Sequence, residues 1–258
     1  MRLRLLILFV VSTSSLASQK TDSLPSHVYH WDSLAVKKQT TWIKRSIIEG
    51  STHSLSWFEV TAITLDPGKA PPPSSAYYDM EELLIIEEGM LNITIDGVSR
   101  KMGAGSVAFI MPRIVHGVSN AGNTKATYYV LKYKGKQPMD IDRAKRAGGS
   151  FALDWNELPT SNTDKGYRRD FFNRPTSQLG QFEMHTTALN AGEESHAPHT
   201  HVQEEIILIL RGHVEMYIDG DRYKASPGDV VFLSSRIPHA LTNTGDEQCE
   251  YFAFQWRN

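Results

Sequence analysis

Three histidines and one glutamate near the C-terminus have residue types and spacing suited to binding a metal. His199 and His201 are separated by one residue, Glu205 follows after three more, and His239 comes later. On a β-strand, residues i and i+2 point the same way, so a strand would project His199 and His201 together, with Glu205 on the same side if no bulge intervenes. Imidazole nitrogens with one carboxylate suit a divalent transition metal such as Mn, Fe, Ni or Zn, whereas calcium needs more oxygens. We therefore predict a single metal site made by these four residues.

His185 is a candidate catalytic residue because it precedes the metal motif in the segment FEMHTT. Strand parity places it on the face of Glu183 and Thr187. It could line the cavity as a general acid or base, or it could be an ordinary strand histidine. The sequence leaves both readings open.

The remaining histidines and the only cysteine are interpreted as non-catalytic. His196 is out of register with the His199 and His201 pair, and His213 follows a turn glycine, so both are expected in solvent. Cys249 has no adjacent histidine and no partner for an intrachain disulfide, which predicts a free thiol in the core. Aromatic residues of the last segment are expected in the barrel wall, with Tyr251 or Gln255 available to face the cavity.

The elements that position these residues come from an internal repeat. The segment WFEVTAITLDPG, ending at Gly68, recurs as QFEMHTTALNAG, ending at Gly192, an offset of 124 residues. After one deletion the offset becomes 123, and it then relates Glu82 to Glu205 and His116 to His239. The chain is therefore a tandem duplication of one domain.

Each copy reads as short strands with turn residues at regular intervals, which is typical of an all-β sandwich or barrel. In the second copy the predicted strands are QFEMHTTAL, EEIILIL, HVEMYI, DVVFL, HALTN and CEYFAFQW. The run 206–210 is too short for a core helix and suits a strand buried on both faces. Residues 135–149 form the predicted linker, with a short helix at 141–147.

The motifs resemble those of the cupin family. The first cupin motif is similar to residues 192–212, where Gly192 is followed by six residues, His199-x-His201, three residues, Glu205, six residues and Gly212. The second cupin motif is similar to the stretch from Gly228 through His239 to Asn243. Ser234 and Arg236 replace the usual Pro and Gly and do not touch a ligand position. The resemblance implies an all-β fold of two tandem cupin domains, which are jelly-roll β-barrels, at residues 24–134 and 150–258.

The first copy lacks a complete ligand set. Ala76 and Tyr78 stand where the second copy has His199 and His201, while Glu82 and His116 remain. One carboxylate and one imidazole are too few for a dedicated metal site. We interpret Glu82 and His116 as hydrogen-bonded relics rather than a degenerate second site, and the first barrel as a structural partner.

A more specific similarity is to the (S)-ureidoglycine aminohydrolase family of manganese bicupins. It rests on the F-x-M-H strand, the THVQE segment and the metal-free first copy. In that family the positions of His199, Glu205 and His239 carry Glu, His and Gln. The similarity favours manganese, but the different ligand set means that the substrate is not transferred.

Composition and charge exclude other classes of function. The 258 residues are 22% charged with a formal net charge of -2 and no long run of one sign, so neither nucleic acid nor a membrane surface is an expected partner. Arg2 and Arg4 precede the apolar run 5–11, and Ser15 and Ala17 suit a signal-peptidase site. Residues 1–17 are thus predicted to be a signal peptide that exports the protein to the periplasm or the extracellular space.

These observations predict a secreted metalloenzyme acting on a small polar or carbohydrate-derived metabolite. The metal would polarise an oxygen of the substrate in a hydrolase, isomerase or dioxygenase type of reaction. The alternative is a non-catalytic module that binds a sugar or the metal itself. A further acid or base in the cavity, with His185 as the candidate, would favour the enzyme. The sequence leaves the oligomeric state open: a homodimer is one alternative, but a bicupin already has the internal pairing that single cupins obtain by dimerising.

Overall fold

The computed structural model describes residues 23–72 and 77–258. The predicted signal peptide at 1–17 and Ala76 lie outside the described residues. Within the described part of the chain, no helix is long and apolar enough to cross a membrane.

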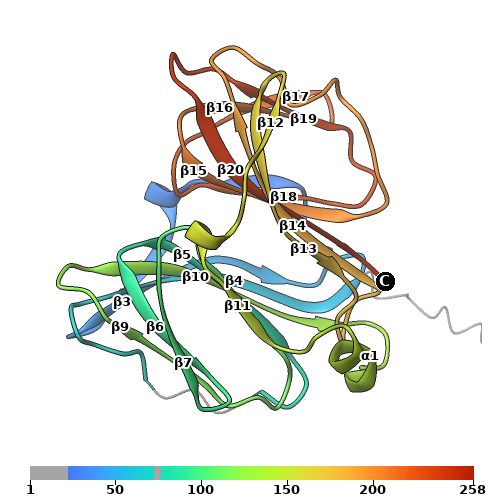
Figure 1. Cartoon of the computed structure of the whole chain (residues 1–258). Helices are drawn as coiled ribbons and strands as arrows, with labels where there is room; N and C mark the ends of the chain where they lie inside the picture. Colours follow the sequence, from blue (N-terminus) through green and yellow to red (C-terminus); the bar gives the residue numbers. More distant parts are fainter. Residues whose placement is uncertain (1–22, 73–76) are drawn as a thin grey trace, which may run out of the picture.

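Two β-barrels make up the fold, one from each copy of the repeat (Figure 1). Each barrel pairs a seven-stranded sheet with a three-stranded sheet, which confirms the prediction of an all-β protein with two tandem jelly-roll domains. In sheet order, the first barrel contains β11 (Phe151–Leu153), β8 (Val107–Ile110), β5 (Glu81–Glu88), β10 (Ala126–Gly135), β4 (Leu55–Leu65), β3 (Trp42–Gly50) and β2 (Ala35–Lys38), facing β7 (Val98–Gly103), β6 (Met90–Ile95) and β9 (His116–Asn120). The second contains β1 (His27–Tyr29), β18 (Val230–Leu233), β15 (Glu204–Arg211), β20 (Cys249–Arg257), β14 (Gln181–Leu189), β13 (Gly166–Arg174) and β12 (Ser161–Thr163), facing β17 (Asp221–Ala225), β16 (Val214–Ile218) and β19 (His239–Asn243).

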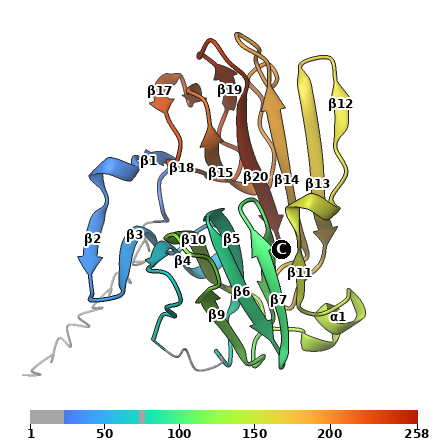
Figure 2. The same ribbon diagram turned by 60° about the vertical axis from the view of Figure 1, so that its left-hand side comes forward.

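The two barrels exchange strands. β1, from the start of the first copy, pairs with β18 of the second barrel (Figure 2). β11, from the start of the second copy, pairs with β8 of the first barrel. The expected domain ranges, 24–134 and 150–258, follow the repeat. If each strand is assigned to the sheet that it joins, β1 belongs to the second barrel and β11 to the first. Both exchanged strands pair at the edge of the other barrel's large sheet, so each covers an edge that would otherwise expose unpaired backbone groups.

A tryptophan after each exchanged strand packs against the opposite barrel. Trp31, in the 3-10 helix η1 (Trp31–Ser33), packs against Gly228, and Trp155, in η2 (Trp155–Glu157), packs against Gly105. Both glycines have positive φ, which favours glycine at each position. A Cβ at Gly105 would overlap the Trp155 indole, so glycine is also required there for space, whereas a Cβ at Gly228 would make a tight contact with Trp31.

The large sheets of the two barrels pack face to face through one shared apolar core. Its largest members come from both halves of the chain and are almost fully buried: Phe58, Phe109, Tyr129, Phe182, Phe232, Phe252, Phe254 and Trp256. The contact between the barrels is therefore built like the interior of a single domain.

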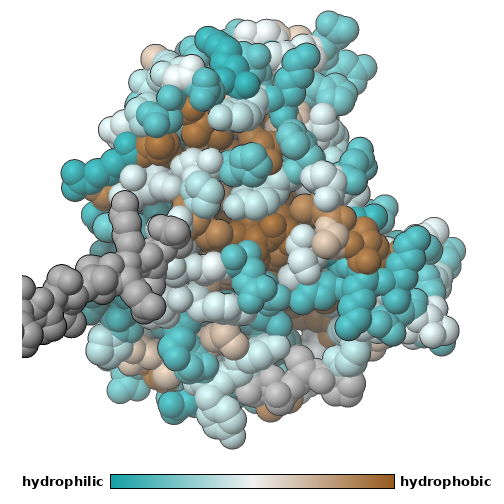
Figure 3. All heavy atoms as spheres, turned by 180° about the vertical axis from the view of Figure 1, so that it is seen from behind, coloured by the Kyte–Doolittle hydropathy of each residue, from teal (hydrophilic) through white to brown (hydrophobic). Residues whose placement is uncertain are grey.

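Seen from behind, the surface is largely hydrophilic, with apolar residues showing in patches between hydrophilic ones (Figure 3).

Two buried glutamates connect the barrels at related positions. Glu204, at the start of β15, accepts hydrogen bonds from Thr52 Oγ1 (2.8 Å) and the backbone N–H groups of His53 (2.7 Å) and Ser54 (3.0 Å). Glu81, at the start of β5, accepts them from Thr176 and Ser177. The first residue of β15 is thus held by the turn between β3 and β4, and the first residue of β5 is held by the turn between β13 and β14.

The linker contains the predicted helix, α1 (Ile141–Arg146). Asp140 caps its N-terminus by accepting a hydrogen bond from the Arg143 N–H (2.8 Å). Gly148 and Gly149, both with positive φ, follow its end. The helix runs from 141 to 146 against the predicted 141–147.

Candidate metal centre

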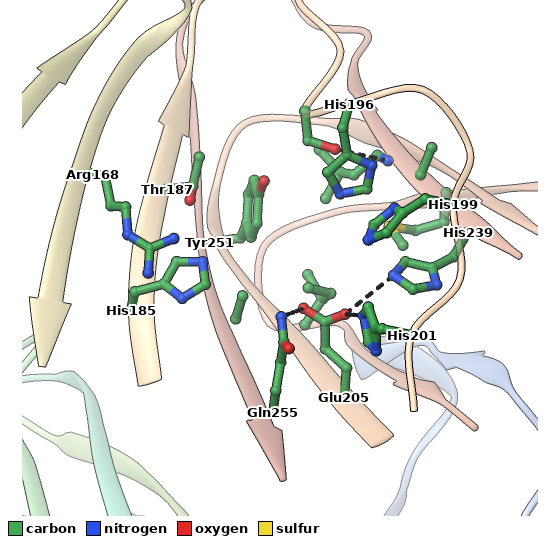
Figure 4. Close-up of a pocket in the computed structure, with 16 residues that line it drawn as sticks. Arg168, His185, Thr187, His196, His199, His201, Glu205, His239, Tyr251 and Gln255 are labelled. Atoms are coloured by element: carbon green, nitrogen blue, oxygen red, sulfur yellow. Dashed lines mark hydrogen bonds and ion pairs between the residues drawn. The ribbon is translucent and has the colours of Figure 1, made fainter. Parts of the chain in front are cut away.

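The predicted ligands line a cavity of about 280 Å³ inside the second barrel (Figure 4). Its walls come from β13, β14, β15 and β20 of the large sheet, from β16 and β19 of the small sheet, and from the loop between β14 and β15. The lining residues are Arg168, His185, Thr187, Ser195, His196, His199, His201, Glu205, Ile207, Met216, His239, Ala240, Leu241, Tyr251, Ala253 and Gln255.

His199 and His201 reach the cavity from a loop, which corrects the strand argument made from the sequence. Residues 190–203 form turns and bends, and Glu204 begins the next strand. His199 makes a single β-bridge with His239, in which each backbone N–H donates to the other's carbonyl at 3.2 and 3.1 Å. This bridge, rather than strand parity, brings the first histidine to the last.

The three imidazoles and the carboxylate converge on one point. One ring nitrogen from each of His199, His201 and His239 lies within 4.8 Å of the others. Glu205 Oε2 lies 3.2 Å from His201 Nε2 and 3.2 Å from His239 Nε2. Gln255 Nε2 lies 3.5 Å from the other carboxylate oxygen. The four residues thus occupy one side of the cavity (Figure 4).

Backbone carbonyls fix the tautomers of the two more buried histidines. His201 Nδ1 lies 3.0 Å from the carbonyl of Gln203, and His239 Nδ1 lies 2.9 Å from that of Ile237. Because a carbonyl only accepts, each Nδ1 carries a proton, so the neutral form of each ring would present its Nε2 lone pair to the cavity, where a metal could bind it. His239 Nε2 is buried without an aligned hydrogen-bond donor or acceptor among the described residues. A buried lone pair beside a carboxylate and two further imidazoles fits a divalent transition metal.

The pKa values of the site reflect this crowding. Burial by itself would raise the pKa of Glu205, but the hydrogen-bonding contacts and charges of His201 and His239 lower it to about 2. The contact with Glu205 raises the pKa of His201. Burial and the three neighbouring histidines lower the pKa of His199. A carboxylate that stays ionised beside a neutral imidazole is the state that binds a cation.

His196 belongs to the cavity, although the sequence interpretation placed it apart. It is exposed, as expected, but its ring lies edge-on to His199 with centroids 4.0 Å apart. Its Nδ1 lies 3.1 Å from the carbonyl of Ala197. The signal in the sequence was the position of His196, three residues before His199. These two rings come together because the loop that carries them folds back on itself.

His185 lies on the opposite wall of the cavity, beside Arg168 (Figure 4). Its Nδ1 is 3.3 Å from Glu183 Oε1 at an angle that does not make a hydrogen bond. The contact with His185 lowers the pKa of Glu183, and the bond from Arg168 (2.9 Å) acts in the same direction. Sequence reasoning missed Arg168, because it comes from β13, outside both motifs.

The side chains of β20 point in two directions, some into the cavity and some into the core between the barrels. Tyr251 and Gln255 both face the cavity, while Phe252, Phe254 and Trp256 point into the core between the barrels. Cys249 is buried and free, which confirms the predicted core thiol. His213 is exposed, as expected, with Nδ1 3.1 Å from Ser226 Oγ.

The first barrel retains two polar residues at the corresponding place. His116 Nε2 lies 3.4 Å from Glu82 Oε1, and Nδ1 lies 3.2 Å from the Ile114 carbonyl, as in His239. Tyr78 is 78% exposed. Among the described residues, only the second barrel brings three metal-ligating side chains together.

Comparison with known proteins agrees with the repeat. The model of the cupin domain family matches residues 62–132 and 185–254, more than half of the chain. No match was found among curated proteins.

Solved structures share the fold at low sequence identity. A putative glyoxylate induced protein from Pseudomonas aeruginosa is 15% identical with a TM-score of 0.71, covering 95% of this chain and 94% of its own. Protein Ylba from E. coli is 17% identical with a TM-score of 0.67, covering 93% and 94%. A mutant of oxalate decarboxylase from Bacillus subtilis is 12% identical with a TM-score of 0.68, covering 93% and 80%. At these identities the likeness establishes the fold alone.

Proposed function

Because the chain belongs to the cupin family and contains two tandem cupin domains, we propose that its second barrel is a metalloenzyme site for a small polar metabolite. The metal would be held by His199, His201, Glu205 and His239. The observation that carries this proposal is His239 Nε2, a buried lone pair beside an ionised carboxylate with no aligned partner among the described groups. Manganese is the proposed metal, on the similarity noted in the sequence.

The cavity supports a small substrate. Its volume of about 280 Å³ lies at the lower end of ligand sites, and its wall carries Arg168, Thr187, Ser195 and Gln255 in addition to the histidines. These groups offer hydrogen bonds to hydroxyl, carbonyl or carboxylate oxygens. Small hydroxy acids, uronates and other carbohydrate-derived acids therefore belong in the first substrate screen.

The proposed division of labour follows from the two walls. When bound, the metal would supply a Lewis acid that polarises a substrate oxygen. Gln255 holds one oxygen of Glu205, which keeps the other directed at the imidazoles. On the opposite wall His185 can accept a proton, and Glu183 at 3.3 Å stabilises the imidazolium that forms. This acid–base group facing the ligands favours an enzyme over a binding module.

Metal content tests the site directly. The purified protein is expected to contain close to one transition metal per chain by elemental analysis. His239→Ala should lose it, whereas His116→Ala, the same substitution at the related position of the first barrel, should retain it. Equal metal content in the two variants, or no metal in the native protein after anaerobic reconstitution with Mn, Fe, Ni and Zn, would refute the proposal.

We also propose that the protein is exported, on the sequence of residues 1–17. The mature chain should then begin at Ser18. N-terminal sequencing of protein recovered from the exported fraction of its native cell measures this, and an intact Met1 in that fraction would contradict it.

A further inference from the structure

The first barrel, which lacks the ligand set, contains the larger cavity. Its volume is about 610 Å³, against about 280 Å³ in the second barrel. Most of its wall is apolar, and its polar side chains are those of Lys44, Tyr77, Glu82, His116 and Lys132. The apolar residues are Trp42, Ile63, Ala70, Pro71, Pro72, Leu84, Val115, Val118, Tyr128 and Val130. A cavity of this size and lining is typical of a site for a small organic ligand.

Lys132 is the residue that distinguishes this cavity from its counterpart. It pairs with Glu82 across β10 and β5, as Gln255 pairs with Glu205 across β20 and β15. The repeat has therefore placed a lysine in one barrel where the other has a glutamine. The first barrel thus has an ammonium group on the strand beside Glu82, where the second barrel has an amide on the strand beside Glu205.

The charge of Lys132 is not neutralised within the described part of the chain. Its Nζ donates to the Tyr77 hydroxyl (2.7 Å) and lies 4.4 Å from the centre of that ring, and both contacts are to a neutral group. No described carboxylate lies within ion-pair distance of it. An ammonium has three donors, so two remain for a ligand.

The other charged groups of the cavity have partners. Glu82 faces His116 at 3.4 Å, and Lys44 forms an ion pair with Glu59 at 3.0 Å. Lys132 is therefore the one charged group lining this cavity that has no ion-pair partner among the described residues. A single negative charge complements it, whereas a dianion would leave one charge desolvated next to Glu82.

We propose that the first barrel binds a small organic monocarboxylate without a metal, with its carboxylate at Lys132 and an aliphatic or aromatic body against the apolar wall. This site is independent of the function proposed for the second barrel. It also assigns the first barrel a role beyond that of a structural partner.

A pair of probes tests the charge requirement on the native, full-length protein. Calorimetric titration with 3-phenylpropanoate should give saturable binding, and the neutral isostere 3-phenylpropanamide should bind at least about 10-fold more weakly, since the charge-assisted hydrogen bond is lost. Equal affinity for acid and amide, or no binding of the acid, would overturn the proposal without the use of any variant.

Substitutions then locate the site. Lys132→Gln installs the residue that the second barrel has at this position, so it is compatible with the strand, and it should weaken binding of the acid at least about 10-fold while changing the affinity for the amide little. Lys132→Arg, which keeps the charge, should restore most of the affinity. Lys134→Gln removes the same charge from an exposed position on the same strand and should have no effect.

The metal site must be separated from this one. His239→Ala, which should lack the metal, is expected to bind the acid as well as the native protein does. Acid binding that disappears in His239→Ala but persists in Lys132→Gln would assign the carboxylate to the second barrel and refute the proposal.

Discussion

Glu204→Ala should be among the most destabilising substitutions outside the apolar core. The carboxylate accepts from five donors: Thr52 Oγ1, the N–H groups of His53 and Ser54, Ser54 Oγ and Trp256 Nε1. Four of the five come from the other half of the chain. Removing it leaves buried donors without their acceptor at the contact between the barrels.

The expected cost follows from how many of those donors can find water. A buried donor left unsatisfied costs about 1 to 3 kcal/mol, and such costs are not additive. The Trp256 indole can still donate to Ser54 Oγ (3.0 Å). A neighbouring cavity of about 390 Å³ touches Glu204, so water can reach some of the rest. We therefore expect a loss of about 3 to 4 kcal/mol, which corresponds to one or two donors left fully unsatisfied.

Equilibrium unfolding in urea at pH 7 measures this loss. Glu81→Ala, which removes the acceptor of three donors, should cost less than Glu204→Ala, and Glu215→Ala, which breaks only a surface ion pair with Arg222, should cost the least. Because Glu204 precedes Glu205, the variant should also bind metal more weakly in a chelator competition. A loss no larger than that of Glu215→Ala would refute the reasoning.

Three further predictions concern catalysis, metal and pH. His185→Gln should leave metal content unchanged while lowering turnover about 10²- to 10⁴-fold in the assay that the substrate screen provides, and an unchanged rate would remove His185 from the chemistry. Chelation should lower the melting temperature, because metal at roughly 1,000 times its dissociation constant stabilises the native state by about 4 kcal/mol, and unchanged unfolding after verified metal removal would contradict the coupling. Burial, and the charge of Glu88, raise the pKa of Glu87 to about 7 from 4.5, so the folded protein binds the extra proton and stability should fall as pH rises from about 4.5 to 7. Glu87→Gln should remove that loss, gaining about 3 kcal/mol at pH 8 and little at pH 4.5 by urea unfolding, and an equal effect at both pH values would show that ionisation is not the cause.

The six strands predicted in the second copy lie close to their observed positions because their local signals agree with their environment, whereas β12, β13 and β17 were not predicted. β14 and β19 have the predicted bounds, and β15, β18 and β20 differ from the predicted segments by a residue at one end. β15 is buried on both faces through six residues, as its continuous apolar run indicated. Alternation along β20 likewise separates Tyr251 and Gln255 from the core aromatics.

The exchange of β1 and β11 had no comparable signal. Each is three residues long, and a short strand carries no information about which sheet edge it will pair with. The repeat in the sequence assigned each strand to its own copy. What places them instead is packing between the halves, such as Trp31 against Gly228, which depends on residues almost 200 positions apart.

The site shows the same limit. The identities of its residues follow from spacing, but the loop that delivers His199 is set by the bridge to His239, and Arg168 arrives from a strand outside both motifs. Spacing alone therefore names candidate ligands without giving the opposite wall of the cavity, where acid–base chemistry would take place.

The glutamate contacts between the halves give the first barrel, which lacks the ligand set, a part in positioning the candidate site. In each copy the glutamate at the cavity, Glu82 or Glu205, directly follows the glutamate that the other half holds, Glu81 or Glu204. The start of β15, and with it the position of Glu205, is thus determined by residues 52–54 of the first half. A carboxylate between two imidazoles at 3.2 Å tolerates little displacement, because metal coordination distances are short and directional. The first barrel therefore helps to position the candidate site without a complete ligand set of its own, and its cavity presents Lys132 where the second barrel has Gln255.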